Sequence, residues 1–320
     1  MIGSVVIWRC AALATCAAIA AVVFIAPGPD TNLRSAIAIH DFGHVVAFGL
    51  VTLLFVFALS TPPRSTFRGR VSAICLAAGA AMVFGATVEL AQAVAGLHGD
   101  PWDVARNAGG AVSVALILIP LDPVLSSRAR AALASAAVFT FAVFTYPVFA
   151  ALEDEARARK QFPALANFES RRELSRFDFA KARNPRIVTL PDSEDGLYSA
   201  VQLRLPTGKY PGIWLRYFPG DWRGMRALQL LIFNPEAKSI ELTVRIDDAE
   251  HDSRLGLEDR YYQSFPLLPG INRIEIPLSN VTAAPSGRRF DLGRVKSLLV
   301  FAVNLEQPHD IAIGPIVLLR

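Results

Sequence analysis

The pattern of hydrophobic and polar positions changes once along the chain, near residue 152. From Val5 to Leu152 the sequence is dominated by Ala, Val, Leu, Ile and Phe, and its charges are isolated or in short clusters. From Glu153 onward charged residues occur throughout, as they do in a soluble domain. Each part is long enough to bury a core of its own, so the pattern predicts two domains.

Apolar stretches in the first domain approach the length of about 20 residues that a helix needs to cross a bilayer. There are five of them: Val5–Ala26, Asp41–Ser60, Val71–Ala93, Val104–Leu121 and Ala131–Leu152. A signal peptide is the alternative for the first stretch, but its apolar run is long and no clean small-x-small cleavage site follows it. We therefore predict a membrane α-helical bundle of about five transmembrane helices over residues 1–152.

The loops between these stretches differ in charge, and this difference predicts an orientation. The loops after the second and fourth stretches are rich in arginine: Arg64, Arg68, Arg70, Arg128 and Arg130. The loops after the first and third stretches contain Asp30, Arg34, Asp100 and Asp103, with few cations. The positive-inside rule then predicts a multi-pass membrane protein with the arginine-rich loops in the cytoplasm. Its N-terminus would be cytoplasmic, and everything after Leu152 would be extracytoplasmic.

Polar residues gather at the predicted outer ends of the second, third and fourth stretches. They are His40, Asp41, His44, Glu89, Gln92, Asp103, Arg106 and Asn107. Helical spacing places Glu89 with Gln92, and Asp103 with Asn107, on common helix faces. Because ionisable groups at membrane depth are costly, this polar cluster is a candidate site.

The same positions resemble the pattern of VanZ-like membrane proteins, a family named for a factor in low-level teicoplanin resistance. The resemblance covers about residues 30–121 and rests on Asp41-Phe-Gly-His44, Glu89-Leu-Ala-Gln92 and Asp103-Val-Ala-Arg-Asn107. Family members usually have an Arg between the Gln and the Asp, whereas this sequence has His98 there and an Arg only at Arg106. The resemblance implies a helical scaffold in the bacterial-type cytoplasmic (inner) membrane of the cell envelope and no particular reaction.

Three interpretations of the polar cluster are open. In a structural interpretation its members hydrogen-bond across helices, Asp103 caps the fourth helix and Arg106 extends to the membrane interface. In a catalytic one, His44 is a general base oriented by Asp41 or Glu89, and the catalytic candidates are His44, Glu89 and Asp103. The third is a His/Glu/Asp metal site, for which the sequence has no HExxH-type spacing.

The second domain begins with a charged, helix-favouring run, Glu153–Lys160, so residues 153–166 are predicted to be a helical stalk or linker. From about Asn167 the hydrophobic period becomes two, most clearly in Ile240–Asp247, where apolar and polar residues alternate. Other predicted strands are Leu197–Leu205, Gly212–Tyr217, Ala227–Phe233, Tyr261–Leu267, Asn272–Pro277, Lys296–Val303 and Asp310–Leu319. Many short strands separated by turns, without alternating helices, predict an all-β sandwich over residues 167–320.

This domain resembles galactose-binding-like jelly-roll domains, the architecture of many carbohydrate-binding modules. The resemblance rests on Asn167-Phe-Glu169, Tyr210-Pro-Gly212, Gly220-Asp-Trp222, Arg245-Ile-Asp-Asp248 and Leu268-Pro-Gly-Ile-Asn272. It implies an extracytoplasmic, carbohydrate-binding-like sandwich. Because a structural calcium near the first and last strands is common in this fold, Glu169 is a candidate ligand. No other cofactor is expected.

Sugar recognition needs flat aromatic surfaces and planar hydrogen-bonding groups, and the second domain offers both. The candidate ligand-binding residues are Trp214, Arg216, Tyr217, Trp222, Arg245, Asp247, His251, Asp259, Arg260 and Tyr262. They are densest between Arg245 and Tyr262. The alternative is that most rings belong to the core, and that Arg245 with Asp247 and Asp259 with Arg260 form surface ion pairs.

Composition excludes some functions. The net charge is only +4 and the arginines form no block, so no nucleic-acid partner is expected. The three cysteines all lie in the apolar domain, which rules out a disulfide framework or a thiolate zinc site in the second.

We therefore expect a non-enzymatic cell-envelope protein that is embedded in membrane lipid and binds an envelope polysaccharide, or a lipid-linked glycan, through its β-sandwich. One alternative is a membrane enzyme or carrier that acts on a lipid-linked envelope substrate at the polar cluster. Another is an assembly protein that contacts a second protein through the sandwich.

Overall fold

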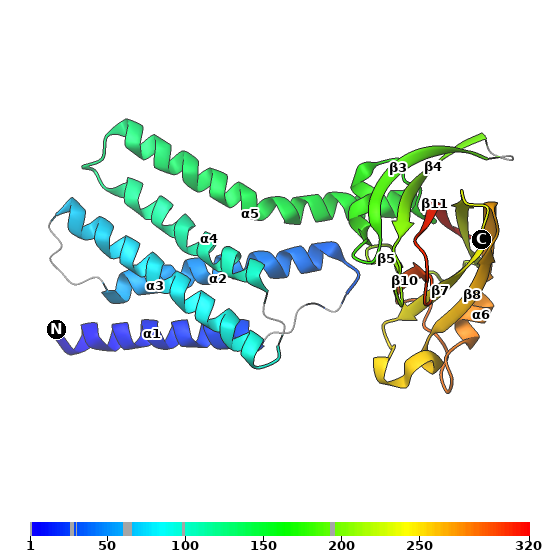
Figure 1. Ribbon diagram of the computed structural model, residues 1–320. Coiled ribbons are helices and arrows are strands. Elements are labelled where there is room, and N and C mark those ends of the chain that lie inside the picture. The colour runs from blue at the N-terminus through cyan, green and yellow to red at the C-terminus, as the bar shows by residue number, and fades with distance from the viewer. Residues whose placement is uncertain (1, 26–28, 30, 60–65, 98–99, 193–195) are drawn as a thin grey trace. The chain divides into compact units, whose positions relative to one another are not determined.

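The computed structural model describes residues 2–25, 29, 31–59, 66–97, 100–192 and 196–320 (Figure 1). Asp30, Arg64 and His98 lie outside the described residues. The chain divides into two compact units. A helical unit contains Met1–Asp30 and Ser35–Ala151, and a sandwich unit contains Thr31–Arg34 and Leu152–Arg320.

The helical unit is formed by α1 (Ile2–Ile25), α2 (Arg34–Leu59), α3 (Phe67–Val94), α4 (Pro101–Leu118), the short η1 (Ile119–Leu121) and most of α5 (Ser127–Gln161). Five of these helices are long and apolar enough to cross a membrane. Most begin before the apolar stretch that predicted them, because a helix also accommodates the polar residues before an apolar run. Arg68, Arg70, Arg128 and Arg130 therefore lie in the first turns of α3 and α5, and not in loops.

Small residues allow the helices to approach closely. A Cβ atom at Gly110 of α4 would lie 2.2 Å from the Val45 carbonyl oxygen of α2. Phe48 and Ala81 are fully buried nearby. The Asp100 side chain accepts a hydrogen bond from the Trp102 amide and caps α4. The expected capping role of Asp103 is thus wrong, since Asp103 lies within the first turn.

The sandwich unit contains two antiparallel sheets. The first has the order β3-β4-β11-β6-β9, with β1 paired to β11, and the second has the order β2-β5-β10-β7-β8. The strands are β1 (Ala164–Ala166), β2 (Phe177–Asp178), β3 (Arg183–Asp192), β4 (Gly196–Leu205), β5 (Gly212–Leu215), β6 (Ala227–Asn234), β7 (Ile240–Asp248), β8 (Tyr261–Leu267), β9 (Gly270–Pro277), β10 (Val295–Phe301) and β11 (His309–Leu319). Short helices η2 (Arg171–Arg176), η3 (Ser253–Asp259) and α6 (Leu278–Ala283) lie between strands.

One hydrophobic core joins the inner faces of both sheets. Leu230 and Ile232 of β6 contribute from the first sheet, and Val244 and Leu298 from the second. Each is at most 1% exposed. The antiparallel β-sandwich predicted from the period-two pattern is therefore present. All eight predicted strands occur, with ends shifted by a few residues, whereas β1, β2 and β3 were not predicted.

Candidate functional site

One row of residues crosses the outward face of the second sheet. The strand register pairs Asp178 with Trp214, Trp214 with Leu299, Leu299 with Arg245, and Arg245 with Tyr262. Because side chains of directly paired residues point to the same face of a sheet, this register aligns the five side chains across all five strands. Residues that are far apart in the sequence thus form one continuous surface.

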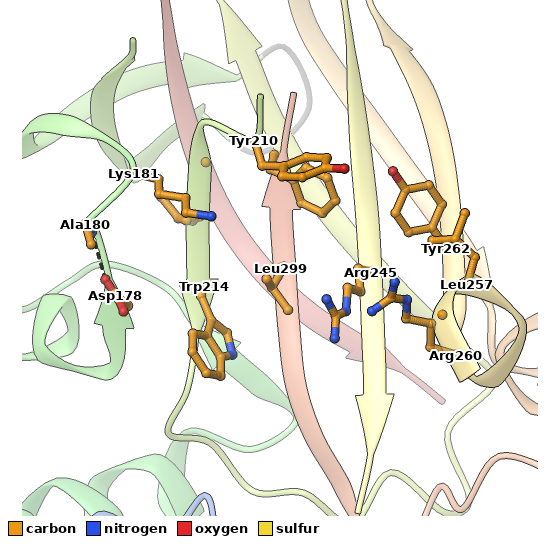
Figure 2. A pocket seen from close by; sticks show the side chains of 14 residues that line it. Asp178, Ala180, Lys181, Tyr210, Trp214, Arg245, Leu257, Arg260, Tyr262 and Leu299 are labelled. Carbon is orange, nitrogen blue, oxygen red and sulfur yellow. Dashed lines mark hydrogen bonds between the residues drawn. The ribbon is translucent and has the colours of Figure 1, made fainter. Parts of the chain in front are cut away.

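This row forms the floor of an open groove with a volume of about 640 Å³. Figure 2 shows the groove with Tyr210 and Tyr262 facing each other. Lys181 lies on the other side of Tyr210, with its ammonium nitrogen 5.9 Å from the Tyr210 ring centroid. The rest of the lining comes from the loop after β2, from β5, from β10 and from η3 with the residue after it. It contains Ala180, Gly212, Ile213, Gly256, Leu257, Arg260 and Phe301. The lining of the groove is therefore mostly apolar, with polar groups at defined points.

Aromatic rings line one part of the groove. The Phe301 ring lies between Tyr210 and Tyr262, with centroid separations of 5.7 and 6.0 Å. A Cβ atom at Gly212 would lie 2.3 Å from the Val300 carbonyl oxygen and 2.4 Å from the Phe301 Cβ, so no side chain fits there. Gly212 thus lets β5 and β10 pack closely beneath the rings, and the ring surfaces of the groove suit the apolar face of a sugar ring.

Two guanidinium groups lie beside these rings (Figure 2). The Arg245 Nε donates to both carboxylate oxygens of Asp247, at 2.9 and 3.0 Å, and Asp247 also accepts from the Ser297 hydroxyl at 2.7 Å. Arg260 differs, because its Nε is buried and has no hydrogen-bond partner among the described residues. Burial lowers the pKa of Arg260, and the neighbouring charge of Arg245 adds to this effect.

A buried ion-pair cluster fixes the wall that contains Arg260. Arg288 donates to both oxygens of Asp248, at 2.6 and 2.8 Å, and its Nε donates to Asp259 at 2.6 Å. Asp259 ends η3 and directly precedes Arg260. The hydrogen bond from Arg288 lowers the pKa of Asp259 against the opposing effect of burial. This cluster holds η3 against β7 and so positions the groove wall.

The predicted ligand-binding residues separate into three groups. Trp214, Arg245, Arg260 and Tyr262 line the groove. Arg216 and Tyr217 lie next to it, with the Arg216 guanidinium 4.5 Å from the Trp214 ring centroid. Asp247, His251 and Asp259 do not line the groove: Asp247 and Asp259 are buried, and the His251 Nδ1 lies 3.1 Å from the Asp259 carbonyl oxygen.

Two expectations need correction. Trp222 is fully buried in the core, where its indole N–H donates to the Pro219 carbonyl, so its ring is not accessible to a ligand. Asp259 forms its ion pair with Arg288, and not with Arg260. The sequence prediction missed Lys181, Tyr210, Leu257 and Phe301 as groove residues; Tyr210, next to a Pro-Gly turn, carried the clearest signal.

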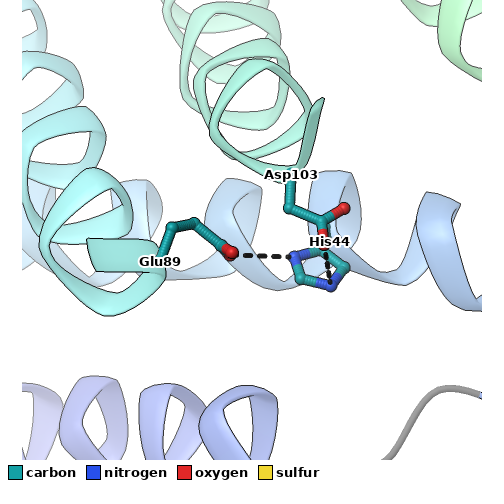
Figure 3. Close-up of side chains that lie close together, drawn as sticks. All are labelled: His44, Glu89 and Asp103. Carbon is teal, nitrogen blue, oxygen red and sulfur yellow. Dashed lines mark ion pairs between the residues drawn. The ribbon is translucent and has the colours of Figure 1, made fainter. Parts of the chain in front are cut away.

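The helical unit contains a second candidate site where α2, α3 and α4 meet (Figure 3). The His44 Nδ1 lies 3.8 Å from Glu89 Oε1, and the His44 Nε2 lies 3.7 Å from Asp103 Oδ2. Asn107 bridges His44 and Glu89: its Oδ1 lies 3.1 Å from the His44 Nδ1, and its Nδ2 donates to Glu89. The Glu89 Oε2 is buried without a hydrogen-bond partner among the described residues.

Other predicted members of the polar cluster lie at its edge. Arg106 forms ion pairs with Asp41 at 2.7 Å, with Asp100 at 3.4 Å and with Asp103. It therefore joins the cluster through three carboxylates. Gln92 donates to the Val23 carbonyl of α1. The His40 Nδ1 lies 3.8 Å from an Asp41 oxygen.

Among the described residues, one group of His, Cys, Asp and Glu side chains has a spacing that fits a metal ion. It consists of His44, Glu89 and Asp103, with one ligand atom from each within 4.8 Å of the others. Figure 3 shows the two carboxylates approaching the imidazole from different sides. Glu169 is exposed and lies outside this group, and a structural calcium remains a prediction.

Several solved structures are similar to the sandwich unit. An exo-β-agarase is 16% identical, with a TM-score of 0.40, over 48% of this chain and 24% of that one. The family 11 carbohydrate-binding module from Clostridium thermocellum, in complex with a β-1,3-1,4-mixed-linked tetrasaccharide, is 16% identical, with a TM-score of 0.35, over 49% of this chain and 94% of the module. The family 30 module of a cellulosomal cellulase from the same organism is 16% identical, with a TM-score of 0.31, over 43% of this chain and 85% of the module.

The alignment thus spans about a quarter of the agarase. No protein-family model matches the chain, and no curated protein sequence matches it. The resemblance of the helical unit to VanZ-like proteins remains a prediction from its polar positions.

Proposed function

We propose that this protein is an integral membrane protein of the bacterial cell envelope whose β-sandwich binds a glycan or glycolipid. The observation that carries the proposal is the in-register row from Asp178 to Tyr262 on the floor of an open groove. Saccharides have flat apolar faces and equatorial hydroxyls. A surface that alternates rings with planar hydrogen-bonding groups complements both features.

The groove residues suit binding without a reaction on the glycan. Hydrolysis of a glycosidic bond by the usual mechanism needs two carboxyl groups about 5–10 Å apart that flank the bond. Among the described lining residues, Asp178 is the one carboxylate, and its Oδ1 accepts a hydrogen bond from the Ala180 amide at 2.7 Å. The residues that line the groove therefore favour a binding role.

The membrane part of the proposal rests on the five long apolar helices and on the arginine-rich ends of α3 and α5. By the positive-inside rule, these ends support a topology with the N-terminus in the cytoplasm and the sandwich outside it. The polar cluster then belongs to the outer half of the bundle. The ordered polar positions of α2, α3 and α4 support the VanZ-like assignment of this scaffold.

A titration of the full-length protein in detergent against a panel of envelope and plant-type oligosaccharides tests the binding proposal. For an oligosaccharide that binds, Trp214→Ala is expected to weaken affinity by about tenfold or more, because a ring face of the groove is lost. The matched control is Tyr217→Ala, which removes a neighbouring ring that does not line the groove and is expected to preserve affinity. Folded protein that binds no oligosaccharide of the panel would refute the proposal.

A further inference from the structure

We propose that the ligand of this groove is an acidic saccharide, one that carries a carboxylate, sulfate or phosphate group, and that Arg260 contacts this group. The inference rests on the proposed glycan-binding function and specifies its ligand class. Two observations support it: the groove is lined by more cations than carboxylates, and the Arg260 Nε has no hydrogen-bond acceptor among the described residues.

The charged residues that line the groove are mostly cations. Lys181, Arg245 and Arg260 line it together with one carboxylate, Asp178. The charge of Arg245 is balanced by Asp247, which lies 2.9 Å away on the same face of β7 and does not line the groove. In the part of the chain that the structure describes, no carboxylate forms an ion pair with Lys181 or Arg260. The groove therefore has an excess of positive charge.

The charge of Arg260 is poorly compensated by the protein itself. Its Nε is buried and has no acceptor among the described residues, and the charge of Arg245 lies close by. A buried donor without an acceptor destabilises the protein, and a second cation nearby adds to this effect. An anionic group in the groove would accept from Arg260 and neutralise the charge, and guanidinium groups bind carboxylates and phosphates especially well.

The surroundings of Arg260 indicate that its position is fixed. The Arg288 cluster immobilises Asp259, the preceding residue, through a 2.6 Å hydrogen bond. The Arg260 guanidinium lies 6.0 Å from the centroid of the Tyr262 ring. A second orphaned donor lies in the same groove, because the indole Nε1 of Trp214 is buried without an acceptor among the described residues. Two donors without acceptors among the described residues thus belong to side chains that line the same groove.

The test compares matched pairs of oligosaccharides on the full-length protein in lipid nanodiscs. Oligogalacturonate, oligoalginate and hyaluronan tetrasaccharides are used as free acids and as methyl esters, which keep the sugar backbone and remove the charge. We expect at least one acid to bind about tenfold more tightly than its ester. This preference should shrink in high salt, because screening weakens the attraction between charges.

Arg260→Gln is expected to reduce the preference for the acid to about threefold or less and to leave the affinity for the ester unchanged. The control Arg226→Gln removes an exposed arginine that is paired with Glu275 on the other sheet, and it should preserve the preference. The same acids coupled to a lipid in vesicles distinguish the source of the ligand. A preference for the acid only in this form indicates a lipid-linked glycan, and a preference in both forms indicates a soluble polysaccharide; either result supports the proposal.

The two proposals can fail separately. Equal affinity for acid and ester in every pair that binds overturns the acidic-ligand inference and leaves glycan binding intact. An acid preference that persists in Arg260→Gln overturns the role of Arg260. Folded protein that binds none of these compounds, and none of the neutral oligosaccharides of the first panel, overturns both proposals.

Discussion

Replacing Arg288 with alanine is expected to lower the free energy of unfolding of the sandwich unit by about 3 kcal/mol or more. The side chains of Asp248 and Asp259 are 0% and 3% exposed, and Arg288 is their main cationic partner in the structure. Without it, two buried carboxylates lose charge-assisted hydrogen bonds of 2.6–2.8 Å. For a unit of this size the loss corresponds to a melting temperature lower by roughly 10 °C.

The pH dependence follows from Asp259, whose pKa is lowered in the folded state mainly by Arg288. Such a group stabilises the fold fully above its unfolded pKa of about 4, and the contribution is lost as pH falls through the lower folded value. The difference in melting temperature between wild type and Arg288→Ala should therefore be largest at pH 7 and should decrease below about pH 4.

The control for this variant is Arg294→Ala. Arg294 also pairs with two carboxylates, Asp291 and Glu250, but its side chain is 60% exposed, so its removal should have little effect. If Arg288→Ala does not fold, Arg288→Lys can be measured in its place. Lysine keeps the charge but lacks the several N–H donors of the guanidinium group, so this variant should be less stable than wild type and more stable than Arg288→Ala. Equal melting temperatures for Arg288→Ala and Arg294→Ala would contradict the assigned role of the buried cluster.

A second large effect is expected in the helical unit, where Gly110→Ala should separate α2 from α4. The new Cβ atom would lie 2.2 Å from the Val45 carbonyl oxygen and 2.9 Å from the Gly49 amide nitrogen, and both are backbone atoms that cannot rotate away. Overpacking of this kind destabilises by about 1–3 kcal/mol, and this contact lies toward the upper end. Unfolding by a denaturing detergent, followed by circular dichroism, measures the change.

Gly43→Ala is the matched control, because its Cβ atom would have no neighbour within 4 Å. Both variants gain the higher helix propensity of alanine, so their difference isolates the contact between helices. Gly43→Ala is expected to be as stable as wild type or slightly more stable. A Gly110→Ala protein as stable as Gly43→Ala would mean that α2 and α4 do not cross at this residue.

The elements themselves could be predicted from the sequence wherever one physical signal dominated. Apolar length predicted the five long helices, and alternation predicted β7, where Leu242, Val244 and Ile246 are fully buried. The signal failed for β3, because Pro185 and Pro191 oppose strand formation in the interior of a sheet. At the edge position that β3 occupies, proline is tolerated.

The groove could be predicted only in part. Composition indicated Trp214, Arg245, Arg260 and Tyr262, because aromatic and guanidinium groups are typical of saccharide sites. The pairing that aligns Asp178, Trp214 and Leu299 depends on strand register between distant segments, which a local pattern does not encode. Trp222 misled the prediction because it lies in a Gly-Asp-Trp turn typical of exposed loops, yet its ring packs 5.8 Å from Phe218 in the core.

The central claim is that the groove lies on the side of the membrane where envelope glycans are found. Fusions of alkaline phosphatase and of a fluorescent protein after Arg320 test it, since the phosphatase is active only outside the cytoplasm and the fluorescent protein only inside. Fusions after Ser126, in the turn before α5, serve as the cytoplasmic reference. We predict an active phosphatase and a dark fluorescent protein after Arg320, and the reverse after Ser126. A fluorescent, phosphatase-negative fusion after Arg320 would place the groove in the cytoplasm and contradict the account.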